Sequence, residues 1–365
     1  MQLKTPGGIE RFITTLAAMF SDEYQVEIVV NYGKPTDALA FPLSKNVQLT
    51  FLSPVQPQEI SMKQIIKGFK WHRIPAELKR RYHINHTRNQ VFKKYFSSLE
   101  TDYIITERAL YNSLVSKCYH GPAKKIATDH NFHQNNPKYI NELLNSVSNF
   151  DALVVATKEL QDFYQPKTNT KCYCIPNALS QIPKRKSTLN TKNLISVGRF
   201  VPEKDYPTLV EVMSKVHAED PKIHLTLIGD GSEKPLIKQL IKAKNLNSCI
   251  TLTGWLSQDQ IANYYYDSSL FVMTSKTEAF GLVLAEAMSY GLPCIAFDRA
   301  SGARAQINSK NGFLIHNTDT TKMAETILSV LNDKNQLKTL QVTINQEIEQ
   351  KYSEETIKKS WQNLL

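Results

Sequence analysis

The sequence lacks several features that would place it in a simple class of protein. No apolar run is long enough to span a bilayer, and the first residues contain no apolar core of a signal peptide, so we expect neither. There is no internal repeat, no low-complexity tract and no complete Gly-x-Gly-x-x-Gly motif. The missing glycine motif argues against a simple NAD-dependent dehydrogenase.

Cysteine is also scarce, and the five cysteines are scattered along the chain. Cys172 and Cys174 lie close together, but no second pair and no histidine cluster accompanies them, so we expect no zinc site. The alternation of side chains from Lys171 to Ile175 predicts a strand instead. Together with the missing signal peptide, this pattern predicts a cytosolic protein with reduced thiols.

The residues that are present predict a two-domain α/β protein. A length of 365 residues and a hydrophobic content of 41% suffice for two packed cores. Segments typical of strands alternate with segments typical of helices, which predicts parallel sheets covered by helices. The polar stretch around Pro183 predicts a linker at a hinged cleft. We therefore place one domain at 1–178, a second at 179–350 and a terminal amphipathic helix at 351–365.

The net charge of +10 is concentrated in one segment of the first domain. Between Lys63 and Lys94 there are ten Lys or Arg residues and a single acid, Glu77. The basic residues Lys63, Lys67 and Lys70 have helical spacing beside an apolar stripe formed by Met62, Ile65, Ile66 and Phe69. Residues 62–94 are therefore interpreted either as a surface for an anionic membrane or as the solvated face of an ordinary helix. We expect no nucleic-acid partner, because no nucleic-acid motif accompanies the charge.

The stretch from Phe271 to Pro293 carries the clearest chemical pattern in the chain. An apolar run, Leu270 to Met273, predicts a strand, and Leu282 to Tyr290 predicts a helix that ends at Gly291. Glu278 lies in the loop between them and Glu286 lies inside the helix. The helix N-terminus offers free backbone N–H groups to a phosphate, and the two carboxylates are spaced to hold hydroxyl groups on either side of it. A glutamate pair alone is weak support, since two surface residues would have the same spacing.

The residues around this pair resemble a known family. The stretch Glu278 to Pro293, EAFGLVLAEAMSYGLP, is similar, nearly position for position, to the signature of the group 1 (family 4) retaining glycosyltransferases. Three further matches are the Gly-Gly-x-Glu-Arg loop that begins at Gly7, a histidine after an apolar strand at His130, and Arg199 followed by Lys204. The resemblance implies a GT-B fold, in which two Rossmann-like domains face each other across a cleft. The terminal helix would then pack back on the first domain.

The resemblance also implies roles for individual residues. Glu278 would hold sugar hydroxyls and Glu286 the ribose of the nucleotide, while Arg199 and Lys204 would hold the diphosphate. His130 would face the donor sugar, although a lone histidine is more often structural, and its neighbours could equally bind the acceptor. The catalytic candidates are therefore His130 and Glu278, and the donor-binding candidates are Gly7, Gly8, Arg199, Lys204, Phe280, Gly281, Leu282 and Glu286.

The implied reaction is transfer of a sugar, with retained configuration, from a nucleotide-sugar, most simply a UDP-sugar, to a glycan or lipid-linked acceptor. The setting would be bacterial surface polysaccharide synthesis at the inner face of the cell membrane. No Asp-x-Asp sequence occurs, so we expect no metal and no cofactor, with cations and helix amides stabilising the leaving diphosphate. The alternatives are a nucleotide-sugar epimerase, a sugar phosphorylase on the same fold, or a non-catalytic partner subunit.

One feature departs from the family pattern. A full strand precedes the glycine loop in the family, whereas only Met1 to Pro6 precede Gly7 here. We therefore expect the first strand of the N-terminal domain to be short or missing. An inner strand that is missing leaves neighbouring backbone groups unpaired, at a cost of about 1–3 kcal/mol for each buried group.

Overall fold

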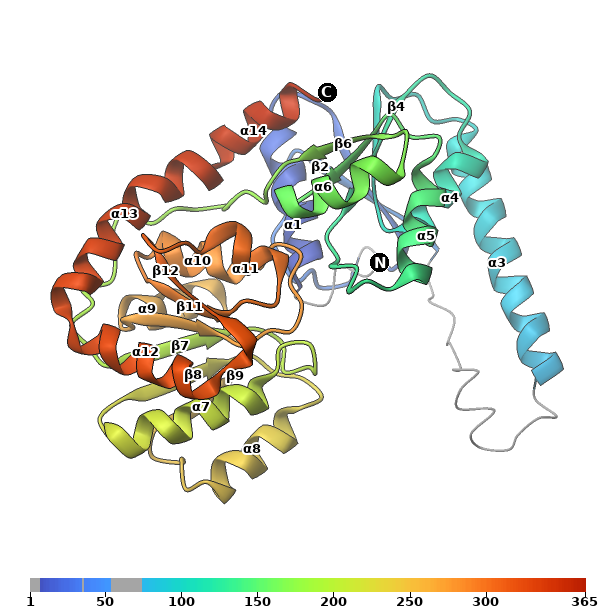
Figure 1. The fold of residues 1–365 in the computed structure, drawn as a ribbon. Coiled ribbons are helices and arrows are strands. Elements are labelled where there is room, and N and C mark those ends of the chain that lie inside the picture. The colour runs from blue at the N-terminus through green and yellow to red at the C-terminus, as the bar shows by residue number, and fades with distance from the viewer. Residues whose placement is uncertain (1–6, 35, 54–73) are drawn as a thin grey trace.

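The computed structural model describes residues 7–34, 36–53 and 74–365, which form two α/β domains (Figure 1). The chain passes from the first domain to the second after Cys174 and before Asn193. All strand pairs within the sheets are parallel. The expected α/β architecture, with two Rossmann-like domains, is confirmed.

The C-terminal domain is built on one sheet of six strands, in the order β12-β11-β10-β7-β8-β9. Its strands are β7 (Asn193–Val197), β8 (His224–Ile228), β9 (Ile250–Gly254), β10 (Leu270–Met273), β11 (Cys294–Phe297) and β12 (Gly312–Ile315). Its helices are α7 (Tyr206–Glu219), α8 (Lys234–Ala243), α9 (Gln258–Tyr266), α10 (Leu282–Ser289), α11 (Ser301–Gln306) and α12 (Thr320–Asn332). The four residues of β10 and the four of β11 are all buried, as expected of continuous apolar runs in the centre of a parallel sheet.

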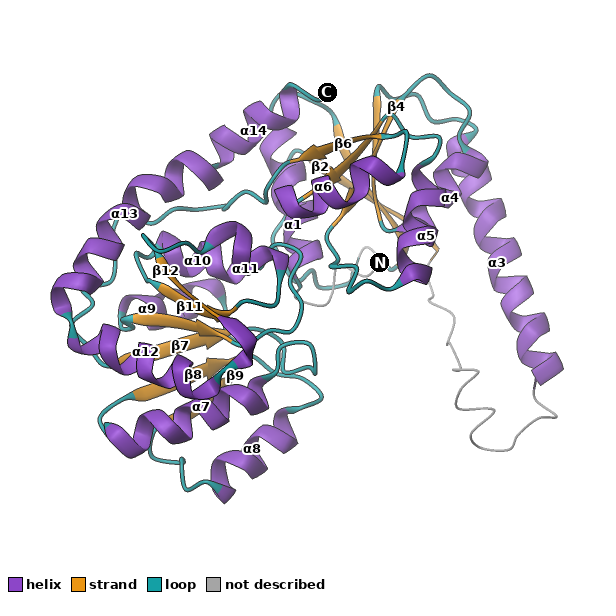
Figure 2. Ribbon diagram, in the orientation of Figure 1, coloured by secondary structure: helices purple, strands orange, loops and turns teal. Residues whose placement is uncertain are grey.

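The N-terminal domain has two sheets where the C-terminal domain has one (Figure 2). β1 (Val26–Tyr32) pairs with β2 (Val47–Ser53), and a separate sheet contains β3 (Tyr103–Glu107), β4 (Lys124–Asp129), β5 (Ala152–Val155) and β6 (Lys171–Cys174). In the described part of the chain, no strand lies between β1 and β3. Val29 on β1 and Ile105 on β3 are 37% and 38% exposed. The predicted short first strand falls on residues 1–6, which lie outside the described residues.

Helices cover both faces of the four-stranded sheet. They are α1 (Gly8–Phe20), α3 (Ile74–Phe96), α4 (Ala109–Cys118), α5 (Pro137–Val147) and α6 (Lys158–Tyr164). The apolar side of α1, formed by Phe12, Leu16, Met19 and Phe20, is buried against the sheet residues Ile126, Ala152 and Val154. α1 is thereby anchored to the four-stranded sheet through packing.

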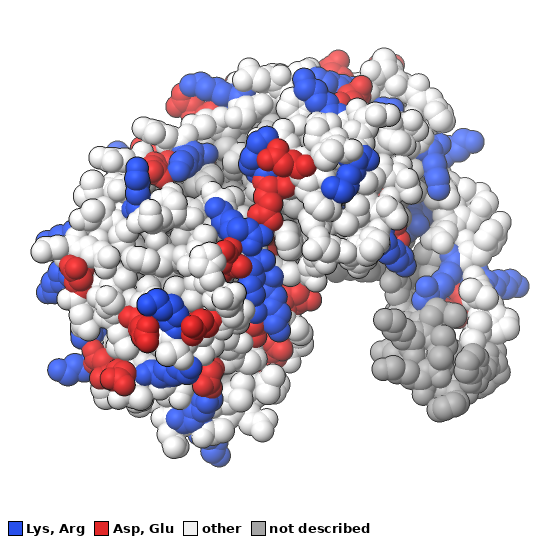
Figure 3. Space-filling model, viewed as in Figure 1, with Lys and Arg blue, Asp and Glu red and all other residues white. Residues whose placement is uncertain are grey.

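The basic segment is described only in part. Residues 62–73, with the predicted apolar stripe and Lys63, Lys67 and Lys70, lie outside the described residues. The rest forms α3, along which Leu78 and Tyr82 are 55% and 72% exposed. Figure 3 shows basic side chains along α3, beside a hollow between this helix and the C-terminal domain. None of the described helices combines the length and the apolar character that a membrane span requires.

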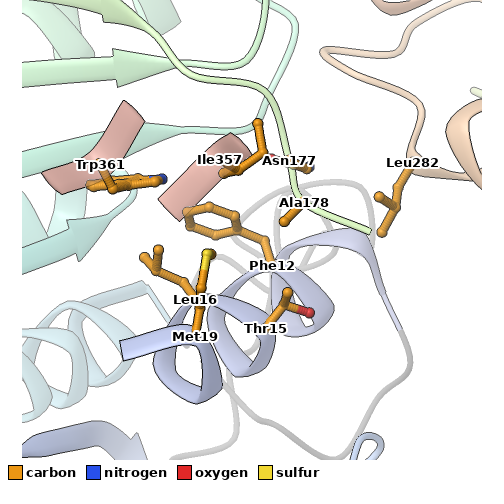
Figure 4. Close-up of a pocket in the computed structure, with 9 residues that line it drawn as sticks. All are labelled: Phe12, Thr15, Leu16, Met19, Asn177, Ala178, Leu282, Ile357 and Trp361. Atoms are coloured by element: carbon orange, nitrogen blue, oxygen red, sulfur yellow. The ribbon is translucent and has the colours of Figure 1, made fainter. Parts of the chain in front are cut away.

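The end of the chain returns to the N-terminal domain as two helices, α13 (Lys334–Tyr352) and α14 (Glu354–Gln362). The predicted single helix from Lys351 onwards is therefore interrupted at Ser353, whose hydroxyl caps α14 by accepting the Thr356 N–H at 3.3 Å. Trp361 and Ile357 of α14 pack on Phe12 and line a small apolar pocket (Figure 4). The pocket lies at the passage between the domains, because Asn177, Ala178 and Leu282 also line it.

Candidate active site

Two loops that leave the carboxyl ends of β7 and β10 bring Lys204 and Glu278 together. The Lys204 ammonium forms an ion pair with the Glu278 carboxylate, and both side chains are mostly buried. The Ser275 hydroxyl donates to the same carboxylate at 3.0 Å. The carboxyl end of a parallel sheet is where α/β proteins usually bind ligands.

The loop that carries Lys204 is fixed by an ion pair that the sequence did not reveal. Asp205 has a left-handed backbone with φ of 53° and is 7% exposed. Arg299 donates to its carboxylate at 2.8 Å and to the Thr274 carbonyl oxygen at 2.6 Å. The Thr274 hydroxyl in turn donates to the Asp205 carbonyl oxygen at 2.9 Å. Arg299 therefore holds the loops after β7 and β10 against each other.

The start of α11 fixes the loop that carries Glu278. The Gly302 N–H donates to the Glu278 carbonyl oxygen at 3.0 Å, and the Gln306 side chain donates to the Phe280 carbonyl oxygen. A Cβ at Gly302 would overlap that same Phe280 carbonyl group, so only glycine allows this approach. Contacts with α11 thus fix the backbone from Glu278 to Phe280, and its orientation does not require a ligand.

The N-terminus of α10 lies directly after this loop. Gly281 precedes the helix with φ of 77°, a left-handed conformation that favours glycine. Among the described residues no side chain caps the helix, and Phe280 and Leu282 at its start are buried. The Leu284 N–H donates to the Gly281 carbonyl oxygen at 2.8 Å. The other N–H groups of the first turn have no acceptor in the described part of the chain, as in helix N-termini that bind anions.

Glu286 lies one turn into α10, and its carboxylate forms an ion pair with Arg11 of α1. The Glu286 side chain is 12% exposed and the Arg11 side chain 20%. Burial raises the pKa of Glu286 above its usual value, and Arg11 acts in the opposite direction. This pair connects the N-terminal domain to the predicted ribose-binding residue.

Arg199 stands apart from the paired charges. Its side chain is exposed, and among the described residues it has no acidic partner. It follows Gly198 at the end of β7, where a Cβ on the neighbouring Gly229 would overlap the Gly198 carbonyl oxygen. The close approach of these two glycines brings the ends of β7 and β8 together beneath Arg199.

In the N-terminal domain, His130 follows β4 as predicted and lies over the ring of Phe12, with centroids 3.9 Å apart. Its Nε2 atom is 3.8 Å from the Glu107 carboxylate at the end of β3, and neither ring nitrogen has a hydrogen-bond partner among the described residues. Gly7 is the N-cap residue of α1, and Gly8 begins that helix with open space around its Cα.

The pKa values of this cluster are set by burial. Burial lowers the pKa of His130 to about 3 and raises that of Glu107 to about 8, against the lowering effect of the hydrogen bond from Thr128. It also raises the pKa of Asp129 to about 6, although hydrogen bonds from Tyr139 and other groups oppose it. Near neutral pH, His130 is thus an uncharged base beside a protonated Glu107.

The structure brings the predicted residues together in two groups that α1 connects. Lys204, Glu278 and the start of α10 lie in one domain and His130 in the other, while Arg11 and Phe12 of α1 reach Glu286 and His130 respectively. Sequence reasoning missed Arg11 as a contact, although it belongs to the Gly-Gly-x-Glu-Arg match. It also missed Glu107, whose position at the end of an apolar strand was a usable signal. The roles assigned to the predicted residues stay predictions.

The described residues contain no group of three or more His, Cys, Asp or Glu side chains arranged to hold a metal ion. All five cysteines are free.

The fold is defined by superposing the chain on solved structures. The chain superposes on a sucrose-phosphate synthase from Thermosynechococcus elongatus with a TM-score of 0.80, over 98% of this chain and 92% of that one, at 19% identity. It also superposes on a mutant of S. aureus TarM, solved with fondaparinux, alpha-GlcNAc-glycerol and UDP, with a TM-score of 0.68 at 26% identity. That match covers 76% of this chain and 58% of TarM. The chain has the GT-B fold.

The second domain carries the likeness to a family. Residues 180–348 match the family model described as Glycosyl transferases group 1. This match and the GT-B fold together support a group 1 glycosyltransferase. A poly(ribitol-phosphate) alpha-N-acetylglucosaminyltransferase of Staphylococcus aureus is 30% identical over 258 residues, which is 67% of this chain and 51% of that protein. The chain spans about half the length of the curated relatives that it matches.

Proposed function

We propose that this protein is a retaining, metal-independent glycosyltransferase that moves a sugar from a UDP-sugar to a glycan or lipid-linked acceptor in bacterial surface polysaccharide synthesis. The observation that carries the proposal is the convergence of Lys204, Glu278 and the N-terminus of α10, which no described side chain caps, at the carboxyl end of one sheet. A cation, a carboxylate and a set of backbone amides in one place suit a sugar diphosphate.

The chemistry follows from where charge develops. As the bond between the sugar and the diphosphate breaks, negative charge grows on the departing phosphate oxygen. When the donor binds, Glu278 exchanges its Lys204 contact for sugar hydroxyls, which frees the ammonium for the diphosphate. Lys204, Arg199 and the amides of α10 then supply fixed positive charge for that oxygen, with no reorganisation during bond cleavage. Closure of the domains excludes water and limits hydrolysis of the donor.

The acceptor side is the N-terminal domain. His130 is neutral near pH 7, and its two ring nitrogens are buried and have no hydrogen-bond partner among the described residues. A substrate hydroxyl group that reaches the ring would therefore find one donor and one acceptor unused. The relatives support the substrate classes: TarM was solved with UDP, and one relative is named a poly(ribitol-phosphate) alpha-N-acetylglucosaminyltransferase.

The basic helix α3 provides the proposed contact with an anionic membrane surface, which would bring the cytoplasmic enzyme to a lipid-linked acceptor. Its exposed Leu78 and Tyr82 lie beside the basic residue Lys79, and the excess of basic residues in this segment would attract anionic lipid. Flotation with vesicles tests this. We expect retention by vesicles that contain anionic lipid and release in high salt, and equal retention by neutral vesicles would contradict it.

The decisive experiment has two stages. A thermal-shift screen of nucleotide-sugars identifies the donor, because a ligand that binds only the folded state raises the melting temperature. Product analysis with that donor and a glycan acceptor then separates the alternatives. A transferase forms a new glycosidic bond and free nucleoside diphosphate, an epimerase forms only an isomeric nucleotide-sugar, and a non-catalytic subunit forms neither. Inversion at the anomeric carbon would overturn the retaining assignment.

A further inference from the structure

Arg11 reaches from the N-terminal domain into the C-terminal domain and is held there by several groups. Besides its ion pair with Glu286, its guanidinium donates to the Ser180 hydroxyl at 3.4 Å. When the Gln258 amide oxygen faces it, that oxygen accepts from both terminal nitrogens at 3.1 and 2.8 Å. The ring of Phe41 lies 6.0 Å from the guanidinium carbon. These partners come from α9, α10, the linker and the loop after β1, so the contact is specific to one arrangement of the two domains.

Glu286 depends on this contact for its charge. The ionisable groups that face Glu286 in the described residues are Arg11, Tyr265 on α9 and Tyr290 at the end of α10. Burial raises the pKa of Tyr290 to about 12 and that of Tyr265 well above its usual value, so both phenols stay neutral. Arg11 is therefore the cation that offsets the burial of the Glu286 carboxylate.

We infer that Arg11 is a positioning residue that couples domain closure to donor recognition. Its ion pair holds the Glu286 carboxylate ionised and oriented, so that the carboxylate can accept hydrogen bonds from the ribose hydroxyls of the donor. Glu286 has two oxygens, and Arg11 engages Oε1, which leaves Oε2 for the ribose. When the domains separate, Glu286 loses its cation and the donor site loses affinity. This inference rests on the proposed function, which assigns the ribose to Glu286.

The test measures UDP binding to the full chain by calorimetry between pH 6 and 8.5. For Arg11→Gln we expect binding at least about 10-fold weaker at pH 7.5, the size of effect usual for a charge-assisted hydrogen bond. The ratio of the variant's Kd to that of the wild type should widen as the pH falls, because Glu286 without its cation takes up a proton. Using the ratio removes the ionisation of UDP itself. Arg11→Lys keeps the charge and should recover most of the affinity and the flat pH profile.

Two further variants isolate the pair. In a Glu286→Gln background, Arg11→Gln should change the Kd less than about twofold, because the group on which it acts is absent. Arg304→Gln is the matched control: Arg304 also bridges the domains, donating to Glu159 at 2.7 and 2.8 Å, but it does not contact Glu286. We expect its Kd ratio to stay near one at every pH.

The outcomes separate the inference from the proposed function. If the wild type binds UDP and Arg11→Gln binds it equally well or more tightly, Arg11 merely masks Glu286 and the inference is wrong. An equal loss in Arg11→Gln and Arg304→Gln would also overturn it, because any interdomain ion pair would then suffice. If the wild type itself binds neither UDP nor a UDP-sugar, the donor assignment fails first and the inference fails with it.

Discussion

In the C-terminal domain, the first strand β7 lies between β8 and β10, and six strands form one parallel sheet. In the N-terminal domain, β1 and β3 are the strands that correspond to β8 and β10, and they belong to separate sheets in the described part of the chain. The loops of the predicted donor site therefore leave a continuous sheet and are fixed by Arg299 and α11. The N-terminal residues of the site are held differently: α1 is anchored by packing on β4 and β5 and on α14. The two halves of the predicted site are therefore held in different ways. The loops of the C-terminal domain are fixed on a continuous sheet, which we call the rigid platform, and α1 is held by the packing of its side chains.

The largest effect that tests this comparison concerns core packing. Phe271 in β10 is completely buried, so Phe271→Ala should lower the free energy of unfolding by about 3–5 kcal/mol. Ile105→Ala in β3 should cost about 1 kcal/mol, because that side chain is 38% exposed. Chemical denaturation of both variants measures the difference. If both variants lost the same free energy of unfolding, Ile105 would have to be covered in solution, and the contrast between the two sheets would be wrong.

The next effect concerns turnover on the rigid platform. Lys204→Ala removes a cation aimed at the leaving diphosphate, and we expect turnover to fall about 100-fold, as when one oxyanion donor is removed. Release of UDP from the donor measures it. Lys310→Ala, at an exposed position of the same domain, is the control and should keep the wild-type rate. A Lys204→Ala variant as active as this control would remove Lys204 from the site.

The third effect is a pH dependence that arises in the N-terminal domain. Glu107 has its pKa raised to about 8, so its contribution to stability is full below the unfolded-state value near 4.3 and is lost as the pH rises through 8. His130 has its pKa lowered to about 3, so its contribution is full above about 6.5 and is lost as the pH falls towards 3. Asp129, with its pKa raised to about 6, contributes fully below the unfolded-state value near 3.9 and loses that contribution as the pH rises through 6.

Between about pH 6.5 and 8, only Glu107 among these three groups still holds an extra proton in the folded state. The free energy of unfolding should therefore fall with rising pH by up to about 1.4 kcal/mol for each pH unit in this range. Glu107→Gln should flatten that slope. Urea unfolding at a series of pH values, followed by amide exchange in β3 and β4, is the measurement, and a slope unchanged in the variant would contradict it.

The smallest effect concerns β1, which pairs only with β2 in the described part of the chain. Val29→Thr should change the free energy of unfolding by no more than about 0.5 kcal/mol, because the side chain is 37% exposed and its new hydroxyl stays hydrated. The same change at the fully buried Val272 in β10 should cost about 1–3 kcal/mol, since the hydroxyl is then desolvated. Thermal unfolding of the two variants sharpens the contrast between the sheets.

Much of this architecture could be predicted from the sequence, and the correct predictions rested on local signals. Leu270 to Met273 was predicted with its observed bounds, because a short apolar run before a polar turn identifies a buried strand. Gly291 correctly marked the end of α10. The break at Ser353 was missed, since the helical pattern continues across it and only the change of direction requires a new cap.

The contacts that complete the site could not be predicted in the same way. Arg11 and Glu286 are separated by 275 residues, and Asp205 and Arg299 by 94. Such pairs depend on how the domains and loops are arranged, which periodicity does not report. Likewise, the chain order alone did not show that Glu107 would lie beside His130, since that depends on the pairing of β3 with β4.

The position of Trp361 has a consequence for how the molecule is made. This fully buried residue completes the core around Phe12 and Leu16, which a ribosome synthesises long before it. Domains generally fold as units in the order of their synthesis. Here the core of the N-terminal domain is complete only after the C-terminal domain and α14 have been synthesised. Nascent chains arrested before α14 should accordingly expose the apolar face of α1 and recruit chaperones.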